Sequence, residues 1–92
     1  MMTMKKTFVG YVTKYALTQG ILETPLRETS YPNMVEDATL ALANYHGDDW
    51  HRLYTDARAK AEDMRKKKIT SLRKSLRKLE ALKFPEKINR LP

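Results

Sequence analysis

The chain has 92 residues, of which 41% are hydrophobic and 32% are charged, and it contains no cysteine. This composition predicts one small folded domain with a highly charged surface, and it excludes disulfides, thiolate zinc sites and thiol nucleophiles. No apolar run is long enough for a signal-peptide core or a membrane span, so we expect a soluble cytoplasmic protein.

The formal net charge is +7, and it is distributed unevenly along the chain. Residues 1–54 contain five basic and six acidic side chains, whereas residues 55–84 contain eleven basic and four acidic ones. The excess of positive charge therefore lies in one segment. Such asymmetry bears on the partners of a protein rather than on its fold.

The N-terminal part of the chain predicts a hairpin. Residues 7–17, TFVGYVTKYAL, have the Val, Tyr, Phe and Thr content of a strand. Gly20 can adopt a positive φ in the connecting loop, and ILETPL gives the return strand. Because Pro25 cannot donate a hydrogen bond to a neighbouring strand, we expect this strand to lie at a sheet edge or to end there.

Residues 27–33 form a predicted loop, and the segment after it is ambiguous. MVEDATLALANY, residues 34–45, is consistent with a helix capped by Asn33 and Glu36, or with a strand from Thr39 to Tyr45. We favour the strand, because HGDD then provides a turn and WHRLY a partner that closes a second hairpin. Trp50, in that partner strand, is expected in the core.

A long helix is predicted to begin at the N-cap Thr55 and to end before Pro85. At about 100° per residue, its apolar residues form one stripe, which we expect to pack across the sheet. The stripe consists of Ala57, Ala61, Met64, Ile69, Leu72, Leu76, Leu79 and Leu82. The predicted fold class is therefore α+β, in a single domain 1–92: a small antiparallel sheet of two hairpins at 7–54, a long basic amphipathic helix at 55–84, and a tail at 85–92.

The same helix carries the predicted binding site. Only Asp63 and Lys67 form a clear favourable i,i+4 pair, so most of the basic residues have like-charged neighbours, which costs helix stability. Solvated Lys-rich helix faces are common, but we favour a surface that binds nucleic acid or an acidic protein. Its candidate residues are Arg65 and Lys68, on or beside the apolar stripe, and Lys66, Lys67, Arg73, Lys74, Arg77 and Lys78 on the opposite face.

The sequence predicts no catalytic or metal site. HGDDWH, from His46 to His51, combines His and Asp, but its spacing matches no metal motif and a turn explains it. There is neither a glycine-rich phosphate loop nor a nucleophile elbow. We therefore expect a binding protein rather than an enzyme, with no cofactor and no small-molecule substrate.

Two segments, YVTKYALTQGI at 11–21 and WHRLYTDARAKAEDMRKKKITSLRKSLRKLEALKF at 50–84, resemble small phage and prophage proteins. Those proteins pair a VTKYALT-GI strand with a basic C-terminal helix. More narrowly, the length and charge resemble phage-encoded anti-CRISPR inhibitors of the type I-F (Csy) surveillance complex. The resemblance implies action in the host cytoplasm, away from membranes, by occupying the crRNA-guided complex and blocking target DNA binding. The implied partners are CRISPR ribonucleoprotein subunits and crRNA.

Two other functions are consistent with the sequence. One is a small nucleic-acid-binding accessory or regulatory phage protein. The other is a helical dimerisation module, in which Leu72, Leu76 and Leu79 form a seam at 3/4 spacing. About four turns is short for a stable helix pair, so we expect a monomer, with a weak dimer as the alternative.

Overall fold

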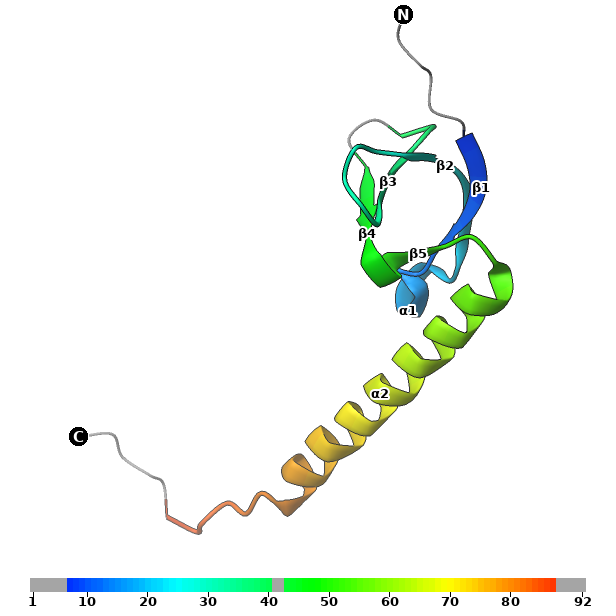
Figure 1. The fold of residues 1–92 in the computed structure, drawn as a ribbon. Coiled ribbons are helices and arrows are strands. Elements are labelled where there is room, and N and C mark those ends of the chain that lie inside the picture. The colour runs from blue at the N-terminus through cyan, green and yellow to red at the C-terminus, as the bar shows by residue number, and fades with distance from the viewer. Residues whose placement is uncertain (1–6, 41–42, 88–92) are drawn as a thin grey trace, which may run out of the picture.

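The computed structural model of the protein describes residues 7–40 and 43–87, and it shows a small curved sheet followed by one long helix (Figure 1). The strands are β1 (Thr7–Val12), β2 (Leu22–Glu28), β3 (Met34–Asp37), β4 (Asn44–His46) and β5 (Trp50–His51). A short helix α1 (Ala16–Gln19) follows β1, and a 3-10 segment η1 (Gly47–Asp49) joins β4 to β5. The long helix α2 spans Tyr54–Ala81, so the predicted α+β class is confirmed.

The sheet curls until its two edge strands approach each other. Its strand order is β4-β3-β2-β1-β5 with antiparallel pairing, and β4 and β5, at opposite edges, are joined by only three residues (Figure 1). Across this closure Trp50 Nε1 donates a hydrogen bond to the Asn33 carbonyl oxygen at 3.1 Å. The Thr13 N–H donates to the Asp49 carbonyl oxygen at 2.8 Å, which continues the pairing of β1 with β5. The predicted second hairpin is therefore wrong, because η1 carries the chain across the open end and β5 pairs with β1.

The first predicted strand is too long. β1 ends at Val12, and the following Thr13 is almost completely buried, with its hydroxyl donating to the Asp48 carbonyl oxygen at 3.0 Å. This tie to η1 turns the chain away from the sheet, and Ala16–Gln19 then form α1. Gly20 ends α1 with a φ of 79°, so the positive φ predicted for it is confirmed.

The edge position predicted for β2 is also wrong, since β2 lies between β1 and β3. The Pro25 carbonyl oxygen accepts a hydrogen bond of 2.9 Å from the Ala38 N–H, one residue beyond the end of β3. The N–H and C=O of one residue in an antiparallel ladder face the same neighbour. An N–H group on Pro25 would therefore face Ala38, which lies beyond the end of β3. Its absence removes no hydrogen bond between β2 and β3 within the sheet.

The ambiguous segment 34–45 contains two strands instead of a helix. β3 and β4 pair with Val35 opposite Tyr45, while residues 41 and 42 of the predicted strand lie outside the described residues. Asp37 organises the turn after β3: its Oδ1 accepts hydrogen bonds from the Thr39 and Leu40 N–H groups at 2.8 and 3.1 Å. Burial alone would raise the pKa of Asp37, but these bonds, with hydroxyl donors, hold it below its ordinary value.

The core inside the curled sheet is small. Val12, Leu26, Val35 and Tyr45, one from each of β1 to β4, form its centre. Phe8, Leu22, Ala43 and Trp50 pack around them, and the Trp50 ring lies 5.9 Å from that of Phe8. Trp50, predicted in the core, packs against the core while remaining only partly buried. Gly10 leaves room for this packing, because a Cβ there would overlap the Leu26 side chain.

The helix α2 does not pack across the sheet, contrary to the prediction. Its first turns contact α1, β1 and β5, but every residue from Arg65 to Ala81 is exposed and the helix projects away from the sheet (Figure 1). The radius of gyration is 20.9 Å, whereas a compact chain of this length would have about 12 Å. The physical reason is that the curled sheet closes around its own core and offers no open apolar face to the helix.

The start of α2 differs slightly from the prediction as well. The helix begins at Tyr54, with Leu53 at the N-cap position and no side-chain hydrogen bond there, so Thr55 is not the cap. It ends at Ala81, and Leu82 is extended before Pro85.

Candidate anion-binding surface on the projecting helix

All eight basic residues predicted to bind a partner lie on α2, and all are exposed. Because α2 is unbroken from Tyr54 to Ala81, its 3.6-residue period keeps six of these side chains on one side. We call this side the cationic face: Lys66, Lys67, Arg73, Lys74, Arg77 and Lys78. The structure therefore brings six of the predicted residues together on one face. The other two, Arg65 and Lys68, lie near the apolar side of the helix.

Two of the eight basic side chains are neutralised locally. Arg65 Nη2 lies 2.6 Å from Glu62 Oε2, and Lys67 Nζ lies 2.9 Å from Asp63 Oδ2, as predicted for the second pair. The hydrogen bond from Lys67 lowers the pKa of Asp63. No ion pair within residues 7–40 and 43–87 involves the other six, which are Lys66, Lys68, Arg73, Lys74, Arg77 and Lys78.

The length of the cationic face defines what it can bind. From Lys66 to Lys78 the helix rises about 18 Å, at 1.5 Å per residue. Measured along the axis of a nucleic acid duplex, each strand has one phosphate about every 3.4 Å, so a helix lying parallel to that axis spans about five of them. A row of point charges on exposed, flexible side chains suits phosphates better than base edges, which require a few precisely placed groups.

The opposite side of the projecting helix is apolar and also exposed. We call it the distal stripe: Ile69, Leu72, Leu76, Leu79 and Leu82. The exposed fraction of these side chains ranges from 39% for Ile69 to 65% for Leu79. The expectation that the whole stripe belongs to the core is therefore wrong beyond Met64. A contiguous apolar surface of this kind usually marks an interaction site.

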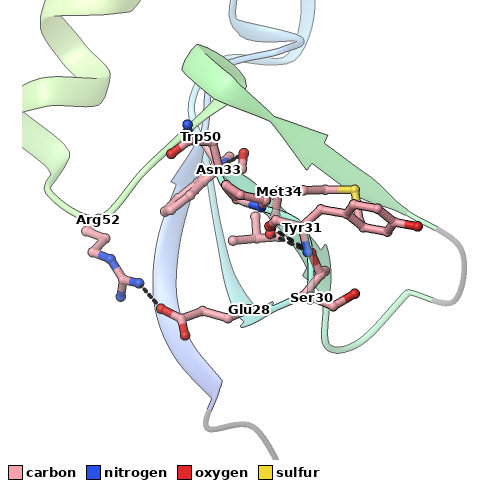
Figure 2. Close-up of a pocket in the computed structure, with 10 residues that line it drawn as sticks. Glu28, Ser30, Tyr31, Asn33, Met34, Trp50 and Arg52 are labelled. Atoms are coloured by element: carbon pink, nitrogen blue, oxygen red, sulfur yellow. Dashed lines mark hydrogen bonds and ion pairs between the residues drawn. The ribbon is translucent and has the colours of Figure 1, made fainter.

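A cavity of about 450 Å³ lies at one end of the curled sheet, beside the loop between β2 and β3 (Figure 2). Glu28 Oε1 and Arg52 Nη2 face each other across its rim at 2.6 Å, and the Arg52 guanidinium lies 4.0 Å from the Phe8 ring centroid. The Trp50 N–H is bonded to the Asn33 carbonyl oxygen. These bonds use the polar groups of Glu28, Arg52 and Trp50 within the protein itself, which indicates a structural role in closing the sheet.

Sequence reasoning identified residues 27–33 only as a loop and missed this cavity. The local signal is present: the Thr29 hydroxyl donates to the Met34 carbonyl oxygen at 3.0 Å, and Asn33 has a φ of 58°. What the sequence could not reveal is the contact with Trp50 and Arg52, which lie at least 17 positions further along.

The side chains of the HGDDWH segment contact different parts of the fold and do not converge on one site. Gly47–Asp49 form η1, His51 Nε2 lies 3.3 Å from the Thr13 hydroxyl, and Asp48 lies 3.7 Å from Lys60 Nζ on α2. These contacts tie β1 and α2 to the end of the sheet. Among the residues that the structure describes, no cluster of three or more His, Asp or Glu side chains could hold a metal ion.

None of the helices in the described ranges combines enough length with enough apolar character to cross a lipid bilayer. Comparison of the chain with protein-family models, with curated proteins and with solved structures finds no match.

Proposed function

We propose that the protein is a binding protein that docks the cationic face of α2 on a polyanion. The observation that carries this proposal is a row of exposed basic side chains along about 18 Å of helix, of which Lys67 alone forms an ion pair within residues 7–40 and 43–87. Like charges at i,i+4 spacing destabilise an isolated helix, and binding to phosphates relieves that repulsion and releases counterions.

The shape of the molecule supports docking of the helix along its partner. Residues 65–81 form about 26 Å of exposed helix beyond the last partly buried residue, Met64. The helix can lie along a groove with its cationic face inward and its opposite side in water. The protein then covers the groove, so it acts by occupancy and without chemistry.

The resemblance described above suggests a specific target. In this proposal the protein is a phage-encoded inhibitor that binds the type I-F crRNA-guided complex in the host cytoplasm and blocks target DNA binding. The cationic face would contact crRNA phosphates or acidic protein side chains. The alternative, a nucleic-acid-binding accessory phage protein, uses the same face on free nucleic acid.

A pull-down from cells carrying the crRNA-guided complex, with the bound RNA sequenced, tests the proposal. The informative variant combines Arg73→Glu, Lys74→Glu and Arg77→Glu, which keeps the helix intact because Glu is almost as good a helix former as Lys or Arg. A matched control changes Lys14, Arg58 and Lys87 to Glu, with the same change in net charge. We expect capture of the complex by the wild type and the control, and loss of capture by the first variant.

Two results would contradict the proposal. Undiminished capture by the folded Arg73/Lys74/Arg77 variant would show that the cationic face is not the working surface. Tight binding of the purified wild type to free nucleic acid, with no capture of the crRNA-guided complex, would favour the accessory-protein alternative.

A further inference from the structure

The distal stripe is not explained by the proposed function. It lies on the side of α2 opposite the cationic face, so a partner bound to that face leaves it in water. Leu72 and Leu76 are each 55% exposed, and Leu79 is 65% exposed. The first turns of the helix are covered by the sheet, but within Tyr54–Ala81 no residue beyond Met64 is even partly buried.

We infer that the distal stripe pairs with the distal stripe of a second copy of this chain, with the two helices antiparallel. Ile69, Leu72, Leu76 and Leu79 follow one another at spacings of three, four and three residues, which is the pattern of a two-helix seam. The inference goes beyond the proposed function: the seam lies opposite Lys67, Lys74 and Lys78, and only Lys66 and Arg73 of the cationic face flank it.

Charge selects the orientation. Lys66, Arg73 and Glu80 lie along one flank of the stripe, whereas Lys68, Ser75 and Leu82 lie along the other. A parallel pair sets one flank against the other. Lys68 of each copy then lies next to Arg73 of the other copy, and these two contacts are repulsive. Glu80 of each copy lies next to the uncharged Ser75 of the other and gains no ion pair.

In an antiparallel pair each flank lies next to the same flank of the second copy. When Leu72 is level with Leu76 of the second copy, Lys66 lies close to Glu80 of that copy, and the symmetry repeats this contact. Between the flanks, two opposite-charge contacts then stand against one like-charge contact, that of the two Arg73 side chains. Arg65, within the stripe itself, and Lys83, in line with it just beyond the end of α2, meet like charges in either orientation: each other in the antiparallel pair, and their own copies in the parallel pair. Ser75 faces Ser75 on the other flank, where small side chains let the helices approach closely.

The shape of the molecule favours the same arrangement. In this register the two curled sheets lie at opposite ends of the helix pair. Ala81, the last residue of α2, is level with Lys67 of the second copy, just beyond Met64, the last partly buried residue of that helix. A parallel pair would place both sheets side by side at one end. In the antiparallel register residues 67–81 of the two helices overlap, which is about 22 Å of helix. The area of contact is therefore at the low end of specific interfaces, and the dimer is weak.

Sedimentation equilibrium across about 5 to 500 µM, the range expected for a weak interface, tests the pairing. We expect the mass to rise from 10.7 kDa towards twice that value. Leu72→Asn with Leu76→Asn should remain monomeric throughout, while circular dichroism and Trp50 fluorescence show that the sheet is folded. A monomeric wild type over the whole range would overturn the inference.

A charge exchange tests the orientation. Lys66→Glu and Glu80→Lys should each weaken dimerisation about tenfold, and the double variant should restore it, because exposed ion pairs contribute up to about 1 kcal/mol each. The matched controls are Lys78→Glu, on the far side of the helix, and Glu23→Lys, in β2, which should have no effect. Failure of the double variant to restore the dimer would overturn the antiparallel arrangement.

Two further measurements separate this inference from other outcomes. The Leu72/Leu76 variant should still capture the target of the cationic face, and a Lys74→Glu, Lys78→Glu variant, changed on the side of the helix away from the seam, tests that face separately. Vesicles with and without anionic lipid provide the second measurement. A wild type that stays monomeric but binds anionic vesicles through Leu72 and Leu76 would identify a lipid surface as the occupant instead of a second copy.

Discussion

Leu26 and Leu76 are the same residue type in opposite environments, and together they test where the core of this protein lies. Leu26 has no exposed surface and sits at the centre of the curled sheet, beneath Gly10. Leu26→Ala removes buried atoms and leaves a cavity, which costs about 3–4 kcal/mol. A domain of this size has a free energy of unfolding of roughly 5–14 kcal/mol, and the small core suggests the lower part of that range. The variant should therefore lose about half of the stability.

Leu76→Ala should behave quite differently. The side chain lies on the projecting helix and is 55% exposed, so its truncation creates no cavity in the core. Ala is also a slightly better helix former than Leu. We expect a change within about 0.5 kcal/mol, which is typical of surface substitutions.

Urea denaturation followed by Trp50 fluorescence and by helical circular dichroism measures both variants. The protein should be at low micromolar concentration, so that pairing through the distal stripe does not add to the stability. A loss of more than about 2 kcal/mol in Leu76→Ala would refute the reasoning, because it would mean that the distal stripe is packed against the sheet. A loss below about 1 kcal/mol in Leu26→Ala would equally contradict the assigned core.

Three further outcomes are expected. Gly10→Ala should lower the free energy of unfolding by about 1–3 kcal/mol, because the new Cβ overlaps Leu26; an unchanged urea midpoint would contradict this. The lowered pKa of Asp37 means that its charged form adds stability above the unfolded pKa of 3.8, and that this stability is lost as pH falls through the folded value. Asp37→Asn should therefore reduce the acid dependence of stability, measured by thermal melts between about pH 2 and pH 5; an unaltered pH profile would count against it. If the cationic face meets phosphates, Lys74→Ala should reduce the salt slope of binding by about one, whereas Lys14→Ala should leave it unchanged.

The helix and its cationic face could be predicted from the sequence because they depend on local rules. An unbroken 3.6-residue period between Thr55 and Pro85 is sufficient to place the helix and to gather Lys66, Arg73 and Arg77 on one side. The positive φ of Gly20 follows in the same way from the conformations open to a residue without a Cβ. These features are set by residues within a few positions of one another.

The closure of the sheet and the exposure of the distal stripe were decided by tertiary structure alone. β5 pairs with β1 and not with β4, and Trp50 bonds to Asn33, through contacts between residues 17 to 40 positions apart. A helical stripe shows only that one side of a helix is apolar; whether it is covered depends on the face that the rest of the chain offers. Here the sheet curls around Leu26 and uses its apolar side for itself, so α2 leaves the sheet with its leucines in water.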